Sequence, residues 1–253
     1  MIPYHDENDT IRPAYITIAL IAACTLAWLV VQGAGSETAL VASVCNLGLI
    51  PGELTQSLRA GMTFPMSERL ACVIDPGPQY ANVVTSMFLH GGWMHLIGNM
   101  WFLWLFGNNI EDSMTRPRFV AFYLMCGLGA ALAQVLADPS SAVPMVGASG
   151  AISGVMGAYL VLYPQARVFT LVPLGFFITT LALPAWVMLI YWMVIQIFGG
   201  LAQGVAQDGG GVAFWAHVGG FVAGVALIKI FAKANHVRAH EAQRYRPQRV
   251  SWE

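Results

Sequence analysis

The chain has 253 residues, of which 57% are hydrophobic and 10% are charged, with a net charge of −1 and a mean hydropathy of +0.62. A soluble domain carries roughly 25% charged residues, so this composition excludes an ordinary soluble enzyme. The charges lie in clusters between long uncharged stretches, which is typical of a polytopic membrane protein. The net charge hides a basic tail, with six Lys or Arg and only two acids in residues 229–253. We interpret this tail as a determinant of orientation and not as a nucleic-acid binding site.

The uncharged stretches predict an all-α fold with six membrane-spanning helices, because crossing the bilayer takes about 20 apolar residues. The predicted spans are residues 14–31, 93–106, 119–137, 149–163, 184–203 and 212–231. The fifth span is taken to begin at a proline, since proline is tolerated in the first helical turn.

The basic residues indicate the orientation and the number of spans. With six spans, ten of the twelve Lys and Arg residues lie on one side, and only Arg59 and Arg69 lie on the other. The positive-inside rule then predicts that both termini are cytoplasmic. Residues 168–183 are apolar enough for a seventh span, but that span would send the basic tail outside. We therefore interpret residues 168–183 as an interfacial or short re-entrant connection.

Three regions follow from this topology: a cytoplasmic N-terminus at 1–13, a membrane domain at 14–231 and a basic cytoplasmic tail at 232–253. An acidic stretch, HDEND, precedes the first apolar run, and no small-x-small cleavage site precedes Gln32, so we expect a retained helix and not a signal peptide. A large external loop at about 32–79 contains Cys45 and Cys72. These cysteines form a disulfide or remain unpaired thiols, and the sequence leaves both alternatives open.

Polar residues within the predicted spans are candidates for function, because each is costly in a membrane unless it is paired or faces water. The fourth span opens with GASGAISG around Ser149, and the sixth contains AHVGGFVAG around His217. In the second span, His95 and Asn99 are four residues apart and share one helical face. A lone serine is more often a packing residue, and an intramembrane histidine also fits a proton relay or a ligand site.

Small residues form a stripe on each of two spans. The stripes are Ser149, Ser153 and Gly157 on the fourth span, and His217, Gly220 and Gly224 on the sixth. Stripes of this kind let membrane helices approach closely. If the two stripes meet, the Ser149 hydroxyl lies beside the His217 imidazole, which is the arrangement that activates a serine nucleophile.

Taken together, GASG, AHVGGFVAG and the block TSMFLHGGWMHLIGNM resemble the rhomboid family of intramembrane serine proteases, in its bacterial six-span form. The blocks lie in the family's order on the second, fourth and sixth spans, and the resemblance covers about residues 79–228. It implies a rhomboid-like six-helix bundle in the lipid bilayer of a bacterial inner membrane, with an active site that opens to the external side. The implied substrates are single-span or polytopic membrane proteins, cleaved without a cofactor in or near a transmembrane segment.

The resemblance also implies a role for each candidate residue. Ser149 would be the nucleophile and His217 the general base and acid, while His95 and Asn99 would stabilise the oxyanion. Gly147 and Gly150, which lack side chains that could block a substrate backbone, would shape the site together with His90. Three histidines could in principle bind zinc, but HxxxxH is not the HExxH pattern of metalloproteases and no carboxylate base is near in the sequence. No metal is therefore expected.

The sequence departs from the family pattern in two places. Ala81 and Asn82 stand where many bacterial relatives have Trp-Arg, which leaves open how the external loop is anchored. Ser153 stands where an aromatic residue often stacks on the catalytic histidine, so the orientation of His217 must depend on another group. The fifth span and the glycine-rich loop at 206–211 are the expected gate over the site, and the alternative for the three glycines of this loop is a tight turn without a gating role.

Two other function classes remain as alternatives. A catalytically silent rhomboid-like protein that binds membrane clients would usually lack the serine or the histidine, and both are present here. A small transporter or proton-coupled channel using His95 and His217 would be expected to contain an internal repeat. The GASG and AHVGG blocks share only their glycines.

Overall fold

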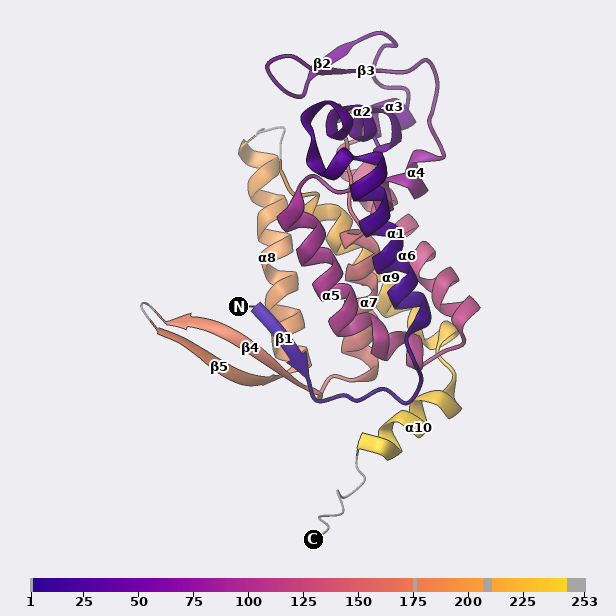
Figure 1. Ribbon diagram of the computed structural model, residues 1–253, viewed down its shortest axis with the longest axis vertical. Coiled ribbons are helices and arrows are strands. Elements are labelled where there is room, and N and C mark those ends of the chain that lie inside the picture. The colour runs from indigo at the N-terminus through magenta and orange to yellow at the C-terminus, as the bar shows by residue number, and fades with distance from the viewer. Residues whose placement is uncertain (1, 175–176, 207–210, 245–253) are drawn as a thin grey trace, which may run out of the picture.

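Helices make up most of the structure, which is a computed structural model that describes residues 2–174, 177–206 and 211–244 (Figure 1). The first half contains β1 (Ile2–Asp6), α1 (Tyr15–Leu26) with a π-helical turn (Ala27–Val31), a 3-10 turn (Gly33–Gly35), α2 (Glu37–Leu47), α3 (Pro51–Leu54), β2 (Thr63–Pro65), β3 (Ala71–Val73), α4 (Asn82–Thr85), a second 3-10 turn (Ser86–Phe88) and α5 (Trp93–Asp112). The second half contains α6 (Arg116–Ala137), α7 (Ser149–Leu162), β4 (Arg167–Leu174), β5 (Phe177–Pro184), α8 (Ala185–Ala206), α9 (Phe214–Phe231) and α10 (Ala234–Arg244).

The centre of the helix bundle is α7. Every residue of this helix from Gly150 to Tyr159 is buried, and the helix packs against α5, α6, α8 and α9. This helix is therefore the core of the bundle. Its first residue, Ser149, precedes the buried run and is half-buried.

The contact between α7 and α9 is made by glycine against backbone. A Cβ atom on Gly220 would overlap the backbone of Gly150, and a Cβ atom on Gly224 would overlap the backbone of Gly154. No residue larger than glycine fits at Gly220 or Gly224 without moving the helices apart. Since lipid provides no hydrophobic force between helices, close packing of this kind is what holds membrane helices together.

The small-residue contact on α7 agrees with the predicted stripe at Gly157. The other two glycine contacts with α9 are one residue further along the helix than predicted, at Gly150 and Gly154. Successive helical positions are about 100° apart, so Ser149 lies beside the contact and not within it. The Ser153 hydroxyl donates a hydrogen bond of 2.6 Å to the Ser149 carbonyl.

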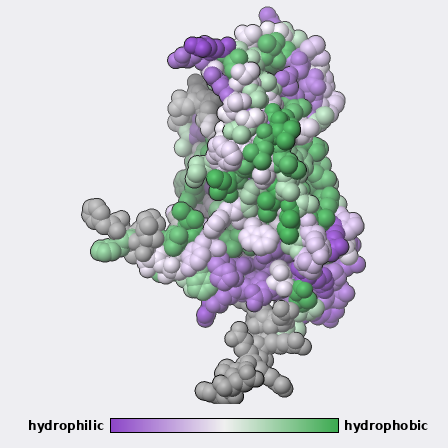
Figure 2. Space-filling view, viewed as in Figure 1, coloured by the Kyte–Doolittle hydropathy of each residue, from purple (hydrophilic) through white to green (hydrophobic). Residues whose placement is uncertain are grey.

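Apolar helices occur at five of the six predicted spans. The exception is the second predicted span, which is α5 and has a mixed composition. Three helices in the described part of the chain, α6, α8 and α9, are long and apolar enough to cross a membrane. The helix of residues Tyr15–Val31 and α7 are apolar but shorter. Hydrophobic residues gather across the middle of the face shown in Figure 2, between hydrophilic residues at the two ends. This distribution is that of an integral membrane protein.

The structure is mostly helical, as predicted, but it is not all-α, because its described part also contains two small sheets. Residues 168–183, predicted as an interfacial or re-entrant connection, form most of the antiparallel hairpin β4–β5. Strand β1, from the predicted N-terminal region, pairs antiparallel with β4 and gives the sheet order β1-β4-β5. This sheet extends sideways from the bundle below α8 (Figure 1). The hairpin is rich in Val, Ile and Thr, which favour strands, but hydropathy alone does not distinguish such a run from a helix.

The segment between α1 and α5 is held together by a disulfide and by hydrogen bonds between its own residues. Cys45 of α2 and Cys72 of β3 form a disulfide, with their Cα atoms 5.2 Å apart. The buried Asn82 side chain donates to the Asn46 carbonyl, and Thr85 donates to the Leu47 carbonyl at 2.7 Å. Asn82, one of the two residues that depart from the Trp-Arg pattern, thus anchors α2.

Buried polar side chains tie both ends of the chain to the end of α5 that lies farthest from Ser149. The Asp112 carboxylate accepts hydrogen bonds from the Arg12 guanidinium at 2.8 Å and from the ring of His240 in α10 at 2.8 Å. In β1, the Asp6 carboxylate accepts a hydrogen bond of 2.6 Å from the Tyr159 hydroxyl. Burial raises the pKa of Asp6 to about 6, although the hydrogen bond from Tyr159 acts in the opposite direction.

We predict that Gly224→Ala destabilises the protein by about 1–3 kcal/mol, because the added methyl group must push α9 away from the Gly154 backbone. The matched control is Gly98→Ala on α5, where an added Cβ atom meets nothing within 4 Å. Thermal unfolding in detergent measures both. Equal unfolding midpoints for the two variants would contradict a close contact between α7 and α9.

Candidate active site

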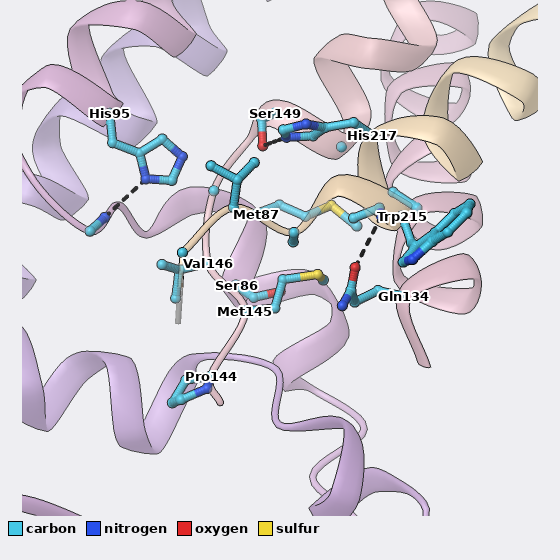
Figure 3. A pocket seen from close by; sticks show the side chains of 18 of the residues that line it. Ser86, Met87, His95, Gln134, Pro144, Met145, Val146, Ser149, Trp215 and His217 are labelled. Carbon is cyan, nitrogen blue, oxygen red and sulfur yellow. Dashed lines mark hydrogen bonds between the residues drawn. The ribbon is translucent and has the colours of Figure 1, made fainter. Parts of the chain in front are cut away.

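Ser149 and His217 lie side by side at the centre of the bundle (Figure 3). The Ser149 Oγ and His217 Nε2 atoms are 2.8 Å apart, which is a hydrogen-bond distance. Ser149 is the first residue of α7, and His217 lies in the first turn of α9. The glycine contact between the two helices sets this distance, because it fixes how α9 lies along α7. The predicted pairing of these two side chains is therefore present in the structure.

The other ring nitrogen of His217 faces a residue that the sequence interpretation missed. Gln196 of α8 is buried, and its Oε1 atom lies 2.7 Å from His217 Nδ1. A signal for Gln196 existed in the sequence, since a glutamine within a long apolar stretch is costly unless it is paired. A neutral amide is neither a nucleophile nor a base, so the chemistry of the motifs does not single it out.

The face of the His217 ring packs against an aromatic residue of α8, the helix that also carries Gln196. The centroids of the Trp192 and His217 rings are 5.7 Å apart, with an angle of 37° between the planes. Ser153 stands where relatives often have an aromatic residue. Within the described part of the chain, its hydroxyl bonds only the Ser149 carbonyl. Orientation of His217 thus depends on α8 and not on the next turn of α7.

His95 lies on the opposite side of Ser149 from His217 in the view of Figure 3. Its Nδ1 atom accepts a hydrogen bond of 3.2 Å from the backbone N–H of Gly91, so the proton of a neutral ring is on Nε2. A Cβ atom on Gly147 would lie 2.8 Å from that Nε2 atom and 3.4 Å from Ser149 Oγ. Gly147 also has a φ of +129°, which favours glycine. The Nε2–H donor of His95 thus points at the space between Gly147 and Ser149.

Asn99 lies one turn further along α5 and also lines the cavity. Its side chain is buried, and its Nδ2 atom has no hydrogen-bond partner among the described residues. Buried amide donors are normally paired, so this donor is free for a group that enters the cavity. The backbone N–H of Ser149 is a further donor, since the first N–H groups of a helix have no partner within it.

Two predicted site-shaping residues act in a different way from the one expected. His90 is fully buried behind His95, with the two ring centroids 5.2 Å apart, and it does not line the cavity. Its backbone N–H and carbonyl each bond the Gln32 side chain at 2.8 Å. Gly150 does line the cavity, but a Cβ atom there would lie 2.6 Å from Ala130 Cβ of α6. Gly150 is therefore required for helix packing as well.

Ser149, His217, His95 and Asn99 line a cavity of about 1290 Å³, to which α5, α6, α7, α8, α9 and the segment before α7 contribute. Its volume is ample for an extended segment of polypeptide. Gly211, at the end of the predicted gate loop, lies on its rim, whereas residues 207–210 of that loop lie outside the described part of the chain. Within the described ranges, no three His, Cys, Asp or Glu side chains are grouped so that they could hold a metal ion.

The arrangement as a whole has the parts needed for acyl transfer. A hydroxyl bonded to an imidazole can become a nucleophile when the imidazole accepts its proton. Donors that converge on one side of that hydroxyl can stabilise a negatively charged oxygen formed by its attack. In this molecule the Ser149 hydroxyl is bonded to the His217 imidazole, His95 lies beside Gly147 near that hydroxyl, and Asn99 has an unpaired donor in the same cavity.

The chain is similar to known proteins that are named as rhomboid proteins. RHOMBOID-like protein 5 of Arabidopsis thaliana is 31% identical over 111 residues, which are 42% of this chain and 36% of that protein. Rhomboid protein 1, mitochondrial, of Saccharomyces cerevisiae is 30% identical over 151 residues, 57% of this chain and 40% of that protein. The putative rhomboid protease YdcA of Bacillus subtilis is 33% identical over 82 residues, 32% of this chain and 41% of that protein. The chain spans less than half the length of each of these relatives.

The family model described as the rhomboid domain matches residues 77–234, from the segment before α4 to the start of α10. This match covers more than half of the chain and contains Ser149, His217, His95 and Asn99. A match of that extent shows that the chain belongs to the rhomboid family.

Proposed function

We propose that this protein is an intramembrane serine protease that hydrolyses peptide bonds in or near the transmembrane segments of membrane proteins. The observation that carries the proposal is the 2.8 Å contact between Ser149 Oγ and His217 Nε2 inside a cavity of a membrane protein. Membership of the rhomboid family supports it, and relatives from Toxoplasma gondii and Bacillus subtilis are named as rhomboid proteases.

In the proposed reaction, Ser149 Oγ attacks the carbonyl carbon of the scissile peptide bond while its proton passes to His217 Nε2. When the C–N bond breaks, the proton moves from His217 to the leaving amine, and an ester to Ser149 remains. Water then attacks the ester and gives its proton to His217, which returns it to Ser149 as the acid product leaves. Every proton is moved by the one imidazole, so no carboxylate has to be charged within the membrane.

The tetrahedral intermediate carries its negative charge on the former carbonyl oxygen. Three donors are available for that oxygen: Nε2–H of His95, Nδ2–H of Asn99 and the backbone N–H of Ser149. In a cavity of low dielectric constant, fixed donors of this kind stabilise developing charge strongly, and loss of one typically costs ~10²–10³ in rate.

The proposed topology has six spans, formed by α1 with its π-helical turn and by α5 to α9. Both termini would be cytoplasmic because most basic residues lie at that end, and the bonded segment with α2 and α3 would be external. Ser149 would then lie below the external surface, within reach of the outer part of a substrate helix. That helix must unwind locally, since its own backbone hydrogen bonds otherwise hide the carbonyl.

Substrate would enter past α8, which packs at the edge of the bundle against α9 and α7 (Figure 1). Near the site, α8 meets α9 through aromatic rings on glycines. A Cβ atom on Gly199 would lie 2.5 Å from the Phe214 ring, and one on Gly200 would lie 3.0 Å from the Trp215 ring. Flat rings that lie on glycines do not interdigitate with other side chains. We therefore expect that separating α8 from α9 takes less free energy than separating α7 from α9.

We predict that Ser149→Ala and His217→Ala each reduce proteolysis to background, and that the double variant is no slower than either single variant. Residues that act as one unit are not additive. Cleavage of a single-span reporter by purified protein in detergent measures this, with the unfolding midpoint as the control for folding. Losses that multiply in the double variant would contradict a dyad.

Asn99→Ala is expected to lower the cleavage rate by ~10²-fold yet stay above the Ser149→Ala background, since other donors still reach the oxyanion. Asn99→Asp should be slower still, because it replaces the donor with a negative charge that faces the developing oxyanion. The matched control is Asn108→Ala, on the opposite face of α5. An Asn99→Ala variant as active as the Asn108→Ala variant would exclude Asn99 from the oxyanion site.

A further inference from the structure

Gln196 presents its amide to the edge of His217 that points away from Ser149. Its side chain is 7% exposed, and Oε1 lies 2.7 Å from Nδ1 of the imidazole. The Ser149 hydroxyl lies 2.8 Å from Nε2. Serine, histidine and glutamine thus form a continuous chain of two short hydrogen bonds, contributed by α7, α9 and α8.

The direction of these hydrogen bonds depends on which end of the amide faces His217. Gln196 Nε2 lies 3.4 Å from the carbonyl of Trp192, one turn earlier in α8, and donates to it. This bond directs the NH₂ group along the helix and leaves Oε1, which can only accept, for the imidazole. His217 Nδ1 must then carry the ring proton, and Nε2 presents its lone pair to the Ser149 hydroxyl.

We propose that Gln196 is the positioning residue of the dyad: it holds His217 in the one tautomer that can accept the proton of Ser149. This proposal rests on the protease function proposed above. The opposite tautomer would place a proton on Nε2 and would direct it at the Ser149 oxygen, where no proton could be accepted. Gln196 does not touch the substrate and acts only through His217.

A neutral amide suits this position better than a carboxylate. An ionised side chain within an apolar span is costly, whereas the amide oxygen accepts the same N–H at no charge. When His217 becomes an imidazolium during the reaction, Nδ1–H remains bonded to Oε1, and that bond strengthens because its donor is then charged. Gln196 thus stabilises the imidazolium that forms during the reaction without placing a second ionised side chain in the membrane.

Because Gln196 and Trp192 are on α8, the dyad is complete only while α8 lies against α9. Trp192 covers one face of the imidazole and Gln196 bonds its edge. An α8 that moved aside would remove both contacts together and leave His217 free to rotate or change tautomer. Entry of a substrate past α8 would therefore suspend the dyad until the helix returns.

The test compares Gln196→Met, which keeps the length of the side chain but cannot accept the Nδ1 proton, with Ile195→Met as the matched control. Ile195 is the adjacent residue on α8, and its side chain is exposed on the outer surface of the bundle. Gln196→Met should lower kcat by ~10–10²-fold, less than the ~10⁴-fold that a triad loses without its aspartate. KM and the unfolding midpoint should stay as in Ile195→Met. Labelling of Ser149 by a small fluorophosphonate, which needs little opening, should slow by the same factor as kcat.

Gln196→Glu again supplies an acceptor for the Nδ1 proton and also adds a negative charge. If Gln196 had only a structural role, this charge would not change the pH dependence of the reaction. The new carboxylate stabilises the imidazolium, so the acidic limb of the pH–rate profile should move to higher pH while activity at alkaline pH exceeds that of Gln196→Met. An unchanged profile, or labelling of Gln196→Met at the rate of Ile195→Met, would overturn the proposal.

Nitrogen NMR of the protein labelled at histidine reads the tautomer without any substrate. The wild-type and Gln196→Glu proteins should carry the His217 proton on Nδ1, and Gln196→Met should show a mixture of tautomers. A wild-type His217 protonated on Nε2 would overturn the proposal directly. If instead the expected tautomers are seen but wild-type protein cleaves no better than Ser149→Ala, the protease function fails and the role of Gln196 in orienting His217 stands.

Discussion

The backbone contact between α7 and α9 is the constraint on which the rest of the molecule depends. Glycines at 150, 154, 220 and 224 let the two helices approach so closely that no side chain separates them. In lipid, where apolar groups gain nothing by leaving the solvent, such packing is the main source of helix association. The same contact brings residues from distant parts of the sequence to hydrogen-bond distance, so the packing of the bundle and the geometry of its polar centre have one origin.

The polar centre is divided among helices that differ in how firmly they are held. Ser149 and His217 are on the tightly packed pair α7 and α9, and the donors His95 and Asn99 are on α5. The groups that orient the imidazole are on α8, which makes fewer close contacts near the site. Ser149, His217, His95, Asn99 and Gln196 each have a hydrogen-bond partner or face the cavity, as a membrane interior requires. In the proposed mechanism, the reacting pair is therefore on the closely packed helices, and the groups that orient the imidazole are on a helix with looser packing.

The sequence predicts the central helices well, because uncharged stretches separated by charges locate them and small-residue motifs single out Ser149 and His217. It does not predict β1, β4 and β5, since an apolar run rich in Val, Ile and Thr has the same hydropathy in a strand as in a helix. Pairing of β1 with β4 joins residues far apart in the chain, and no local pattern encodes it. The disulfide of Cys45 and Cys72 cannot be predicted without the distance between their Cα atoms. The orientation of the Gln196 amide likewise cannot be predicted without the position of α8.

The way in which α8 begins has a mechanical consequence. The backbone N–H of Ala185 bonds the Ala166 carbonyl at 2.8 Å, and that of Trp186 bonds the Pro164 carbonyl at 3.1 Å, so the helix is pinned at its first residues and is a lever from there on. At 1.5 Å per residue, Gln196 lies about 16 Å from this pivot and the far end about 30 Å. A tilt of about 5° would then shift Gln196 by roughly 1.4 Å and the far end by roughly 2.7 Å. A shift of roughly 1.4 Å is enough to break the hydrogen bond between Gln196 and His217. A small tilt of α8 would therefore release the imidazole while the helix still lies against the bundle.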